Sequence, residues 1–402
     1  MKTTLAPRYR RLALFLGILC SGGILLFPRI PMLVGMLVLC LMVPRFKLSS
    51  RLEPVFFLLS LIFVFALMHT GGANFEALAV RYANFLAGVL LLNVYLQEQP
   101  ITLTEDLYVI LKWFAIQCLV TVVLATAAPF LFMDVPYLDM NYQSVGLVFT
   151  YHATIDANPV FVRPDGFFYE PGIYQIYLNL YLYLALYVYK NTRHSILALV
   201  AVGATQSTTG VVIAGILLGV YSLKWLGSRE LMRSPERLLI GLALVFPLAV
   251  LLMTNVNDKL TGDSRGSAWA RQYDLITGVN VVMAHPLMGI GFDHGKYRQV
   301  ANNIGFTGSE LSRESTTDRD SSNGILYLLY SIGIPLSIPF LIGMFRQHFF
   351  PNKFLVGMLL FVSLQSEAII YTPFILLLIF SGLLRRAPQA RPRQENAELP
   401  AK

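Results

Sequence analysis

Charged residues are scarce in this chain. Of its 402 residues, 13% are Asp, Glu, Lys or Arg and 55% are hydrophobic. A soluble globular protein carries about 25% charged residues, so the composition argues against a soluble domain and predicts a polytopic membrane protein. The formal net charge of +8 does not indicate nucleic-acid binding, because Lys and Arg fall mostly in short segments between apolar runs, as the positive-inside rule predicts.

Cysteine is also scarce. Cys20, Cys40 and Cys118 all lie in apolar runs, without C-x-x-C spacing, and their number is odd. This argues against a disulfide framework and against a thiolate metal site, and we expect all three to be packing residues. The first apolar run lacks a small-residue cleavage site and is followed at once by a second run, so we expect a retained first span and not a cleaved signal peptide.

Long apolar runs are abundant. Runs of about 17–25 apolar residues can cross a bilayer, and about twelve segments are predicted to do so, namely roughly 12–28, 31–44, 54–70, 75–95, 107–132, 171–189, 195–208, 209–226, 238–255, 323–345, 353–370 and 371–384. The prediction is an all-α polytopic protein with one membrane domain over residues 1–384. Basic clusters place both termini in the cytoplasm and the loops at about 133–169 and 256–322 outside, the larger with short helices of its own. The Arg/Pro-rich segment 385–402 is predicted to be a disordered cytoplasmic tail.

A polar junction precedes the predicted span at 171–189. The chain reads F-V-R-P-D-G-F-F-Y-E-P-G over residues 161–172 and continues into a tyrosine-rich apolar helix. Pro171 suits the first position of a helix, and a carboxylate at Glu170 is favoured by the helix dipole. Arg163 and Glu170 are therefore expected where water meets membrane, at a site that works on an amphiphile. Tyr174 follows in the first turn, where it belongs to an interfacial tyrosine belt, packs in the core or stacks on a sugar.

Further arginines lie in the larger external loop. The segment from Asp263 begins D-S-R-G-S-A-W-A-R and opens a predicted amphipathic helix that carries Arg265, Trp269 and Arg271. Guanidinium groups present forks of donors that match phosphate oxygens, so converging arginines can hold a pyrophosphate without a metal. The alternatives are that these arginines anchor lipid headgroups or form a salt bridge within the loop.

The same loop contains two patterns that resemble known ligand motifs. Gly289 and Gly291 form a G-x-G, but the third glycine and the βαβ unit of a dinucleotide site are missing. Asp318-Arg319-Asp320 spells a D-x-D, yet the chain lacks the soluble nucleotide-binding domain in which such a motif holds metal. We therefore expect a solvated loop there and take Arg319 as a further phosphate candidate.

A few charged residues interrupt apolar spans, where a charge is costly and counts as a functional hypothesis. Arg81 lies near the external end of its span, so it either snorkels or serves the site. Glu367, inside the predicted span 353–370, is a lesser candidate.

Together these segments resemble the superfamily of O-antigen polymerases (Wzy-type) and O-antigen ligases (WaaL-type), bacterial membrane glycosyltransferases. The resemblance rests on the span pattern, the R-P-D-G-F-F-Y-E-P-G entry, the Thr/Ser-rich turn ending at Gly210, S-R-G-S-A-W with H-P-L-M-G-I-G, and S-S-N-G-I-L-Y-L-L-Y-S-I-G-I. In that family a polar stretch with asparagine opens the span after the large external loop, which places Asn323 among the substrate-binding candidates.

The resemblance implies transfer of an oligosaccharide from undecaprenyl pyrophosphate at the periplasmic face of the inner membrane, with no cofactor, metal or nucleotide sugar. Arg163 and Arg265 would face the donor pyrophosphate, and Glu170 would be the base or would orient Arg163. Ligases of the family usually place histidine where this chain has Ser322, and the Glu-Pro-Gly at 170–172 also favours a polymerase of O-antigen or exopolysaccharide. The rival functions are an O-antigen ligase and a lipid-linked oligosaccharide flippase. A chain-length regulator and a flippase are the expected protein partners, and nucleic acid is not expected as one.

Overall fold

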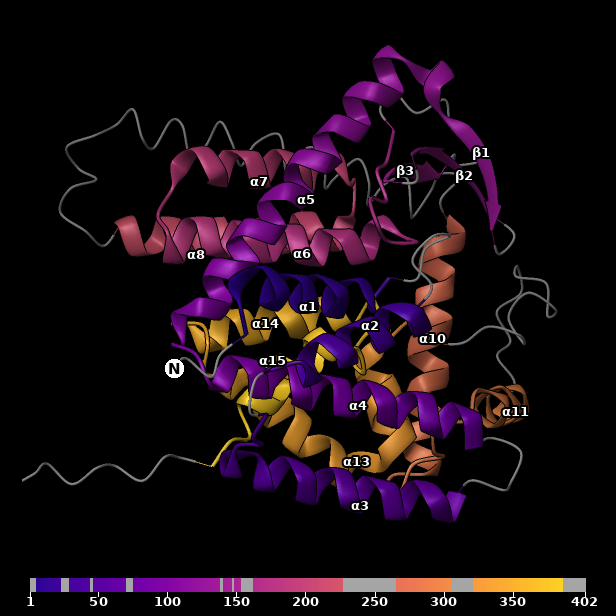
Figure 1. Ribbon diagram of the computed structural model, residues 1–402. Coiled ribbons are helices and arrows are strands. Elements are labelled where there is room, and N and C mark those ends of the chain that lie inside the picture. Colours follow the sequence, from indigo (N-terminus) through magenta and orange to yellow (C-terminus); the bar gives the residue numbers. More distant parts are fainter. Residues whose placement is uncertain are drawn as a thin grey trace, which may run out of the picture.

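The structure is a computed structural model that describes residues 5–22, 29–43, 46–69, 75–137, 140–146, 148–152, 162–226, 265–304 and 321–385. These residues are mostly helical (Figure 1). The helices are α1 (Pro7–Leu19), α2 (Arg29–Leu41), α3 (Glu53–His69), α4 (Phe75–Leu96), α5 (Ile101–Ala127), α6 (Pro171–Tyr183), α7 (Thr192–Ala204), α8 (Thr208–Leu226), α10 (Arg265–Ala284), α11 (His294–Ile304), α13 (Gly324–Arg346), α14 (Lys353–Leu364) and α15 (Pro373–Ser381). Short 3-10 turns lie at Ser50–Leu52 and Pro129–Leu131, and a π-helical turn, Leu184–Val188, extends α6.

Four helices of the described chain, α3, α4, α5 and α13, are long and apolar enough to cross a membrane. Four shorter apolar helices, α2, α7, α8 and α14, accompany them. The helical membrane architecture is thereby confirmed, but the count of twelve spans is not. The predicted span at 238–255 and the tail from residue 386 lie outside the described residues.

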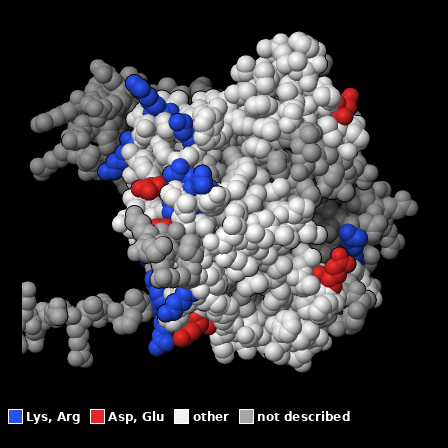
Figure 2. Space-filling model, viewed as in Figure 1, with Lys and Arg blue, Asp and Glu red and all other residues white. Residues whose placement is uncertain are grey.

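Charge divides the molecule into two ends. Figure 2 shows Lys and Arg gathered along the edge where the N-terminus lies, and a broad, almost uncharged surface separating them from the few charges at the opposite edge. The strands, α10 and α11 lie at that opposite edge (Figure 1). Such a band fits the hydrocarbon core of a bilayer. We name the strand-bearing end the outer end and the basic end the inner end, and their assignment to periplasm and cytoplasm stays a prediction of the positive-inside rule.

The loop at about 133–169, which the sequence predicts to be external, contains a sheet that the all-helical expectation did not include. Strands β1 (Met133–Tyr137), β2 (Met140–Val145) and β3 (Phe149–His152) form an antiparallel meander in the order β1-β2-β3. The register pairs Val135 with Tyr142 and Ser144 with Thr150, and the hydroxyls of the second pair are 3.0 Å apart. The strands satisfy backbone groups where the chain leaves the helical bundle.

Helix α13 is broken at Gly333, and the segment between α10 and α11 fits into the break. Gly333 has φ of 77° and Gly289 has φ of 67°, which is the region that favours glycine. Across the contact, Ile290 N donates to Tyr330 O at 2.7 Å, and Ile334 N donates to Pro286 O at 2.8 Å. A Cβ atom on Gly289 would lie 2.5 Å from Tyr330 O. The G-x-G of the sequence therefore fastens α10 to α13 through main-chain bonds.

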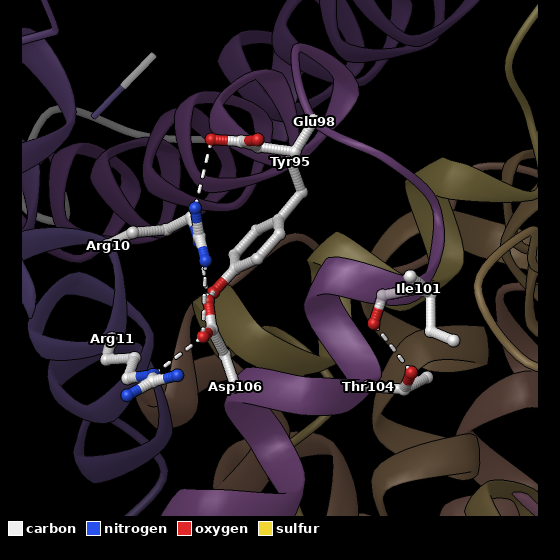
Figure 3. A network of polar contacts seen from close by, with 7 residues as sticks. All are labelled: Arg10, Arg11, Tyr95, Glu98, Ile101, Thr104 and Asp106. Atoms are coloured by element: carbon white, nitrogen blue, oxygen red, sulfur yellow. Dashed lines mark hydrogen bonds and ion pairs between the residues drawn. The ribbon is translucent and has the colours of Figure 1, made fainter. Parts of the chain in front are cut away.

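The inner end contains a buried ionic network built on Asp106 (Figure 3). The carboxylate accepts from Arg10 Nε at 2.6 Å, from Arg11 Nε at 2.8 Å and from the Tyr95 hydroxyl at 3.1 Å. Glu98 Oε1 accepts from Arg10 NH1 at 2.9 Å. The span expected at 107–132 begins earlier, at Ile101, because these partners allow Asp106 to lie in a buried helical turn.

Candidate functional site

The segment 162–170 is held at the outer end by β3. Tyr151 and Pro164 form an isolated bridge, and Asp165 N donates to Thr150 O at 2.9 Å. The neighbouring Arg163 donates from Nε to the carbonyl oxygen of Thr205, at 3.3 Å. The Arg163 guanidinium is thus fixed between the sheet and the turn that joins α7 to α8.

Glu170 is the N-cap of α6, and Pro171 is its first helical residue. This confirms the helix start predicted from the sequence. The Glu170 side chain makes no capping hydrogen bond to the first turn, so the carboxylate is not used as a cap. Tyr169 O next to it accepts from the Tyr142 hydroxyl at 2.9 Å, which ties this residue to β2.

Helix α10 brings Arg271 to the same place. Figure 1 shows α10 running across the outer end, roughly perpendicular to α4. One turn after Arg271, Asp274 Oδ2 accepts from Ser322 N at 3.0 Å and from Ser322 Oγ at 2.5 Å. This bond fixes the rotation of α10 against the start of α13 and with it the direction of Arg271, which is exposed.

Glu367 completes the cluster from the non-helical segment between α14 and α15. Its side chain is buried, with 3% exposed. A Cβ atom on Gly172, in the first turn of α6, would overlap Glu367 Oε1, and a Cβ atom on Gly324 would lie 2.6 Å from Glu367 O. Two glycines at the starts of two helices therefore leave room for this residue. Both helix starts direct positive dipole ends toward it.

These residues interact electrostatically. Burial lowers the pKa of Arg163, the carboxylates of Asp165 and Glu170 counter this effect, and the positive charge of Arg271 adds to it. Burial raises the pKa of Glu367 well above its usual range, the negative charge of Glu170 raises it further, and Arg271 opposes both. We name this group the outer cluster: Arg163, Asp165, Glu170, Arg271 and Glu367.

The outer cluster contains three of the predicted site residues, Arg163, Glu170 and Arg271. Arg265 and Trp269 lie in the first turns of α10, as the sequence predicts, but their side chains are outside the described part of the structure. Arg319 lies outside the described residues, as do Asp318 and Asp320.

Three further predicted residues have structural contacts. Asn323 caps α13, its Oδ1 accepting from Leu326 N at 2.9 Å. Arg81 lies over the rings of Tyr327 and Tyr371, 5.2 and 5.4 Å from their centroids. Tyr174 is fully buried, and its hydroxyl donates to Phe114 O at 2.5 Å. Substrate contacts of all three stay predictions, and the geometry gives Tyr174 a packing role.

The sequence did not indicate Asp165 as a site residue, and it gave Glu367 only as a lesser candidate. Asp165 occupies the R-P-D-G turn between two candidates, and that proximity was the available signal. Among the residues described, no group of three or more His, Cys, Asp or Glu side chains is arranged to hold a metal ion. The charged groups that converge here suit an anionic ligand, through the two guanidinium groups, and a proton transfer, through the carboxyls.

The bundle and the outer cluster define a polytopic membrane protein with a charged site at one end of its helices. Residues 194–341, from α7 into α13, match the family model described as O-antigen ligase. This match supports the resemblance to the O-antigen ligase and polymerase superfamily that the motifs predicted. Searches of curated proteins and of solved structures gave no match. The match includes Arg271, whereas Arg163, Glu170 and Glu367 come from segments on either side of it.

Proposed function

We propose that the protein is a polymerase of O-antigen or exopolysaccharide in the bacterial inner membrane. It transfers a growing glycan from undecaprenyl pyrophosphate to a lipid-linked repeat unit at the periplasmic face. The observation that carries the proposal is the convergence of Arg163 and Arg271 with Glu170 at the outer end of a helical bundle of this superfamily. An amphiphilic donor has its pyrophosphate at this depth, where its lipid tail enters the bilayer.

The chemistry follows from the leaving group. The acceptor hydroxyl oxygen attacks the anomeric carbon of the donor, the bond from that carbon to the phosphate oxygen breaks, and the pyrophosphate leaves with the electron pair. Arg163 and Arg271, with Arg265 from the same helix, neutralise the developing charge, so no general acid is required. Glu170 accepts the hydroxyl proton. The alternative role for Glu170 is to orient Arg163 without taking a proton.

Two sequence features favour a polymerase over a ligase. Ligases of the superfamily usually have histidine where this chain has Ser322, and the Ser322 hydroxyl donates to Asp274. The Glu-Pro-Gly at the start of α6 is the second feature. The description of the matching family as O-antigen ligase keeps transfer to the lipid A core as the second candidate. A flippase is a weaker candidate, because transporters gather polar groups near the bilayer midplane, whereas the outer cluster lies at one end.

Incubation of the purified protein with a lipid-linked repeat unit, with products separated on a gel, tests the proposal. A ladder of lengths is expected. A single transfer onto lipid A core, when that acceptor is supplied, would identify a ligase instead. Absence of any glycan product with either acceptor would leave transport as the function.

The orientation is tested separately by cysteine labelling. Lys296 lies on α11 at the outer end, so Lys296→Cys should react with a membrane-impermeant maleimide from the periplasmic side. Selective reaction from the cytoplasmic side would contradict both the topology and the periplasmic site.

A further inference from the structure

Two adjoining cavities lie at the inner end of the helices, and Lys353 lines both of them. The larger cavity, about 410 Å³, lies between α8 and α14 and is lined almost wholly by apolar side chains. The smaller cavity, about 250 Å³, lies where α13 and α15 end, and its lining residues are Phe345, Arg346, His348, Lys353, Gly382 and Leu384. Both are separate from the outer cluster, because Lys353 begins α14, whereas Glu367 follows the end of that helix.

The loop between α13 and α14 is held in place by hydrogen bonds. Gln347 is fully buried, and its Oε1 accepts from Phe350 N at 2.9 Å. His348 N donates to Ser381 Oγ at 3.2 Å, which ties the loop to the end of α15. The backbone around the smaller cavity is therefore positioned before a ligand binds, which lowers the entropy cost of binding.

Positive charge gathers around the smaller cavity. Burial lowers the pKa of His348, although a hydrogen bond with the Ser381 main chain opposes this effect. The positive charges of Lys353, Arg51 and Arg346 lower this pKa further. Within the described part of the chain, neither Arg346 nor Lys353 forms an ion pair. This positive charge suits an anionic group such as a phosphate.

Three carboxylates of the inner end are engaged by other arginines. Asp106 and Glu98 both pair with Arg10, and Glu53 pairs with Arg385. The basic edge seen in Figure 2 therefore includes cations that are balanced within the chain and, at the smaller cavity, cations that are left for a ligand from outside it.

The larger cavity has about the length of one bilayer leaflet. Its lining residues extend along α14 from Asn352 to Val362, a rise of about 15 Å, which is half of the roughly 30 Å hydrocarbon core. Two of these lining residues, Phe354 and Ile216, are 70% and 43% exposed, so the cavity is open at the surface. An apolar cavity of this length, open at its side, suits an acyl chain.

We propose that the two cavities form one binding site for an anionic phospholipid from the leaflet at the inner end. The phosphate group lies between Arg346 and Lys353, and one acyl chain follows α14 in the larger cavity. Basic pockets between membrane helices bind anionic headgroups in this way. The lipid joins α8 and α14 to the ends of α13 and α15, and it stabilises the folded protein because the site exists only there.

Native mass spectrometry in detergent tests the headgroup half of the site. The unchanged protein should retain phosphatidylglycerol, which is anionic, at a lower added concentration than phosphatidylcholine, which is zwitterionic. The double variant Arg346→Gln/Lys353→Gln should weaken retention of phosphatidylglycerol about tenfold or more, because each basic residue attracts the anionic headgroup. Equal retention of the two lipids by the unchanged protein would overturn the proposal.

Lys190→Gln/Arg193→Gln is the matched control. Both residues are exposed, they lie where α6 is joined to α7 at the inner end, and they line neither cavity. This double variant loses the same charge but should retain phosphatidylglycerol as the unchanged protein does. An equal loss of binding in both double variants would assign the effect to the general basic charge of this end and would refute a defined site.

Ile216→Trp tests the apolar half without a change in charge. The larger side chain fills part of the larger cavity and should weaken retention of phosphatidylglycerol. An excess of inorganic phosphate should not displace the lipid, since a free phosphate gains nothing from the larger cavity. Unchanged retention in Ile216→Trp, or displacement by inorganic phosphate, would refute the position of the acyl chain and with it the lipid site.

Thermal unfolding shows whether the variants fold and supplies a second measurement. Without added lipid, the two double variants should have the midpoint of the unchanged protein, because the replaced side chains are exposed. Phosphatidylglycerol should raise the midpoint of the unchanged protein and of the control, and should raise that of Arg346→Gln/Lys353→Gln less. An equal rise in all three would contradict the proposal. None of these measurements uses glycan transfer, so they hold whether or not the protein is a polymerase.

Discussion

The two ends of the molecule use arginines and carboxylates in opposite ways. At the inner end, Asp106 accepts from Arg10, Arg11 and Tyr95, and Glu98 takes the remaining contact of Arg10. At the outer end, the positive charge of Arg271 lowers the pKa of Arg163, and the negative charge of Glu170 raises the pKa of Glu367. One network is closed by short hydrogen bonds between opposite charges, whereas the other brings together both like and opposite charges, whose effects on the pKa values of Arg163 and Glu367 oppose one another.

The difference separates a structural network from a functional one. A buried polar network with every member paired rigidifies the fold, and the inner network does this for α1, α4 and α5. Groups held with like charges have shifted pKa values, which are typical of sites that bind ions or move protons. We therefore expect substitutions at the inner end to change stability and those at the outer end to change turnover.

Glu170→Gln should give the largest effect. A general base that becomes an amide loses its proton acceptor, so the polymerisation rate should fall on the order of 10² to 10⁴-fold, with little change in thermal stability. The measurement is initial polymer synthesis on a lipid-linked repeat unit, with membrane abundance as control. A variant that keeps most of its rate would assign Glu170 to orienting Arg163.

Among these changes, Asp106→Asn should lower the free energy of unfolding the most. The change leaves Arg10 and Arg11 without their common carboxylate, and breaking a buried ion pair costs about 3 kcal/mol or more. Thermal unfolding in detergent should show a clear drop in the midpoint. The exposed pair of Arg385 and Glu53, 3.1 Å apart, offers the matched control, because Glu53→Gln should cost at most about 1 kcal/mol. Equal losses from the two changes would show that the inner network is not a structural centre.

Arg163→Lys and Arg265→Lys should have smaller effects on turnover. Lysine keeps the charge but loses the planar fork. Loss of a charged hydrogen bond worth about 1.5–3 kcal/mol lowers the rate about tenfold to hundredfold. Arg193→Lys, an exposed arginine in the first turn of α7, should leave the rate unchanged. If both variants made polymer at a near-normal rate and were present in the membrane at normal abundance, Arg163 and Arg265 would be lipid-headgroup anchors and not pyrophosphate ligands.

Chelation should have the smallest effect of all. Arginines are proposed to hold the pyrophosphate, so EDTA should leave the rate of polymerisation within error of the untreated protein. Loss of activity that magnesium or manganese restores would contradict this and would make Asp318 and Asp320 candidate metal ligands.

The sequence predicted the parts of the site that local chemistry determines. Pro171 and Glu170 mark a helix start because proline at the first position and a carboxylate before it are favoured by the helix itself. The local sequence pattern likewise predicted a helix that carries Arg265 in its first turns and a late span that begins near Gly324.

The remaining parts depend on contacts between distant segments. Glu367 was assigned to a continuous span, because nothing local indicates that Gly172 and Gly324 leave room for it. The β1–β3 sheet was missed because its strands are short and Pro136 interrupts the first. Asp106 was left just outside the predicted span at 107–132, since its partner Arg10 is 96 residues away in the sequence.

The interlock between Gly289 and the break at Gly333 has an evolutionary consequence. Its bonds run from main chain to main chain, so they do not depend on the identity of most side chains around them. Side chains around this contact can therefore be exchanged while α10 keeps its place against α13. We expect substitutions at the two glycines to be rare among related chains, and variation elsewhere along the contact to be common.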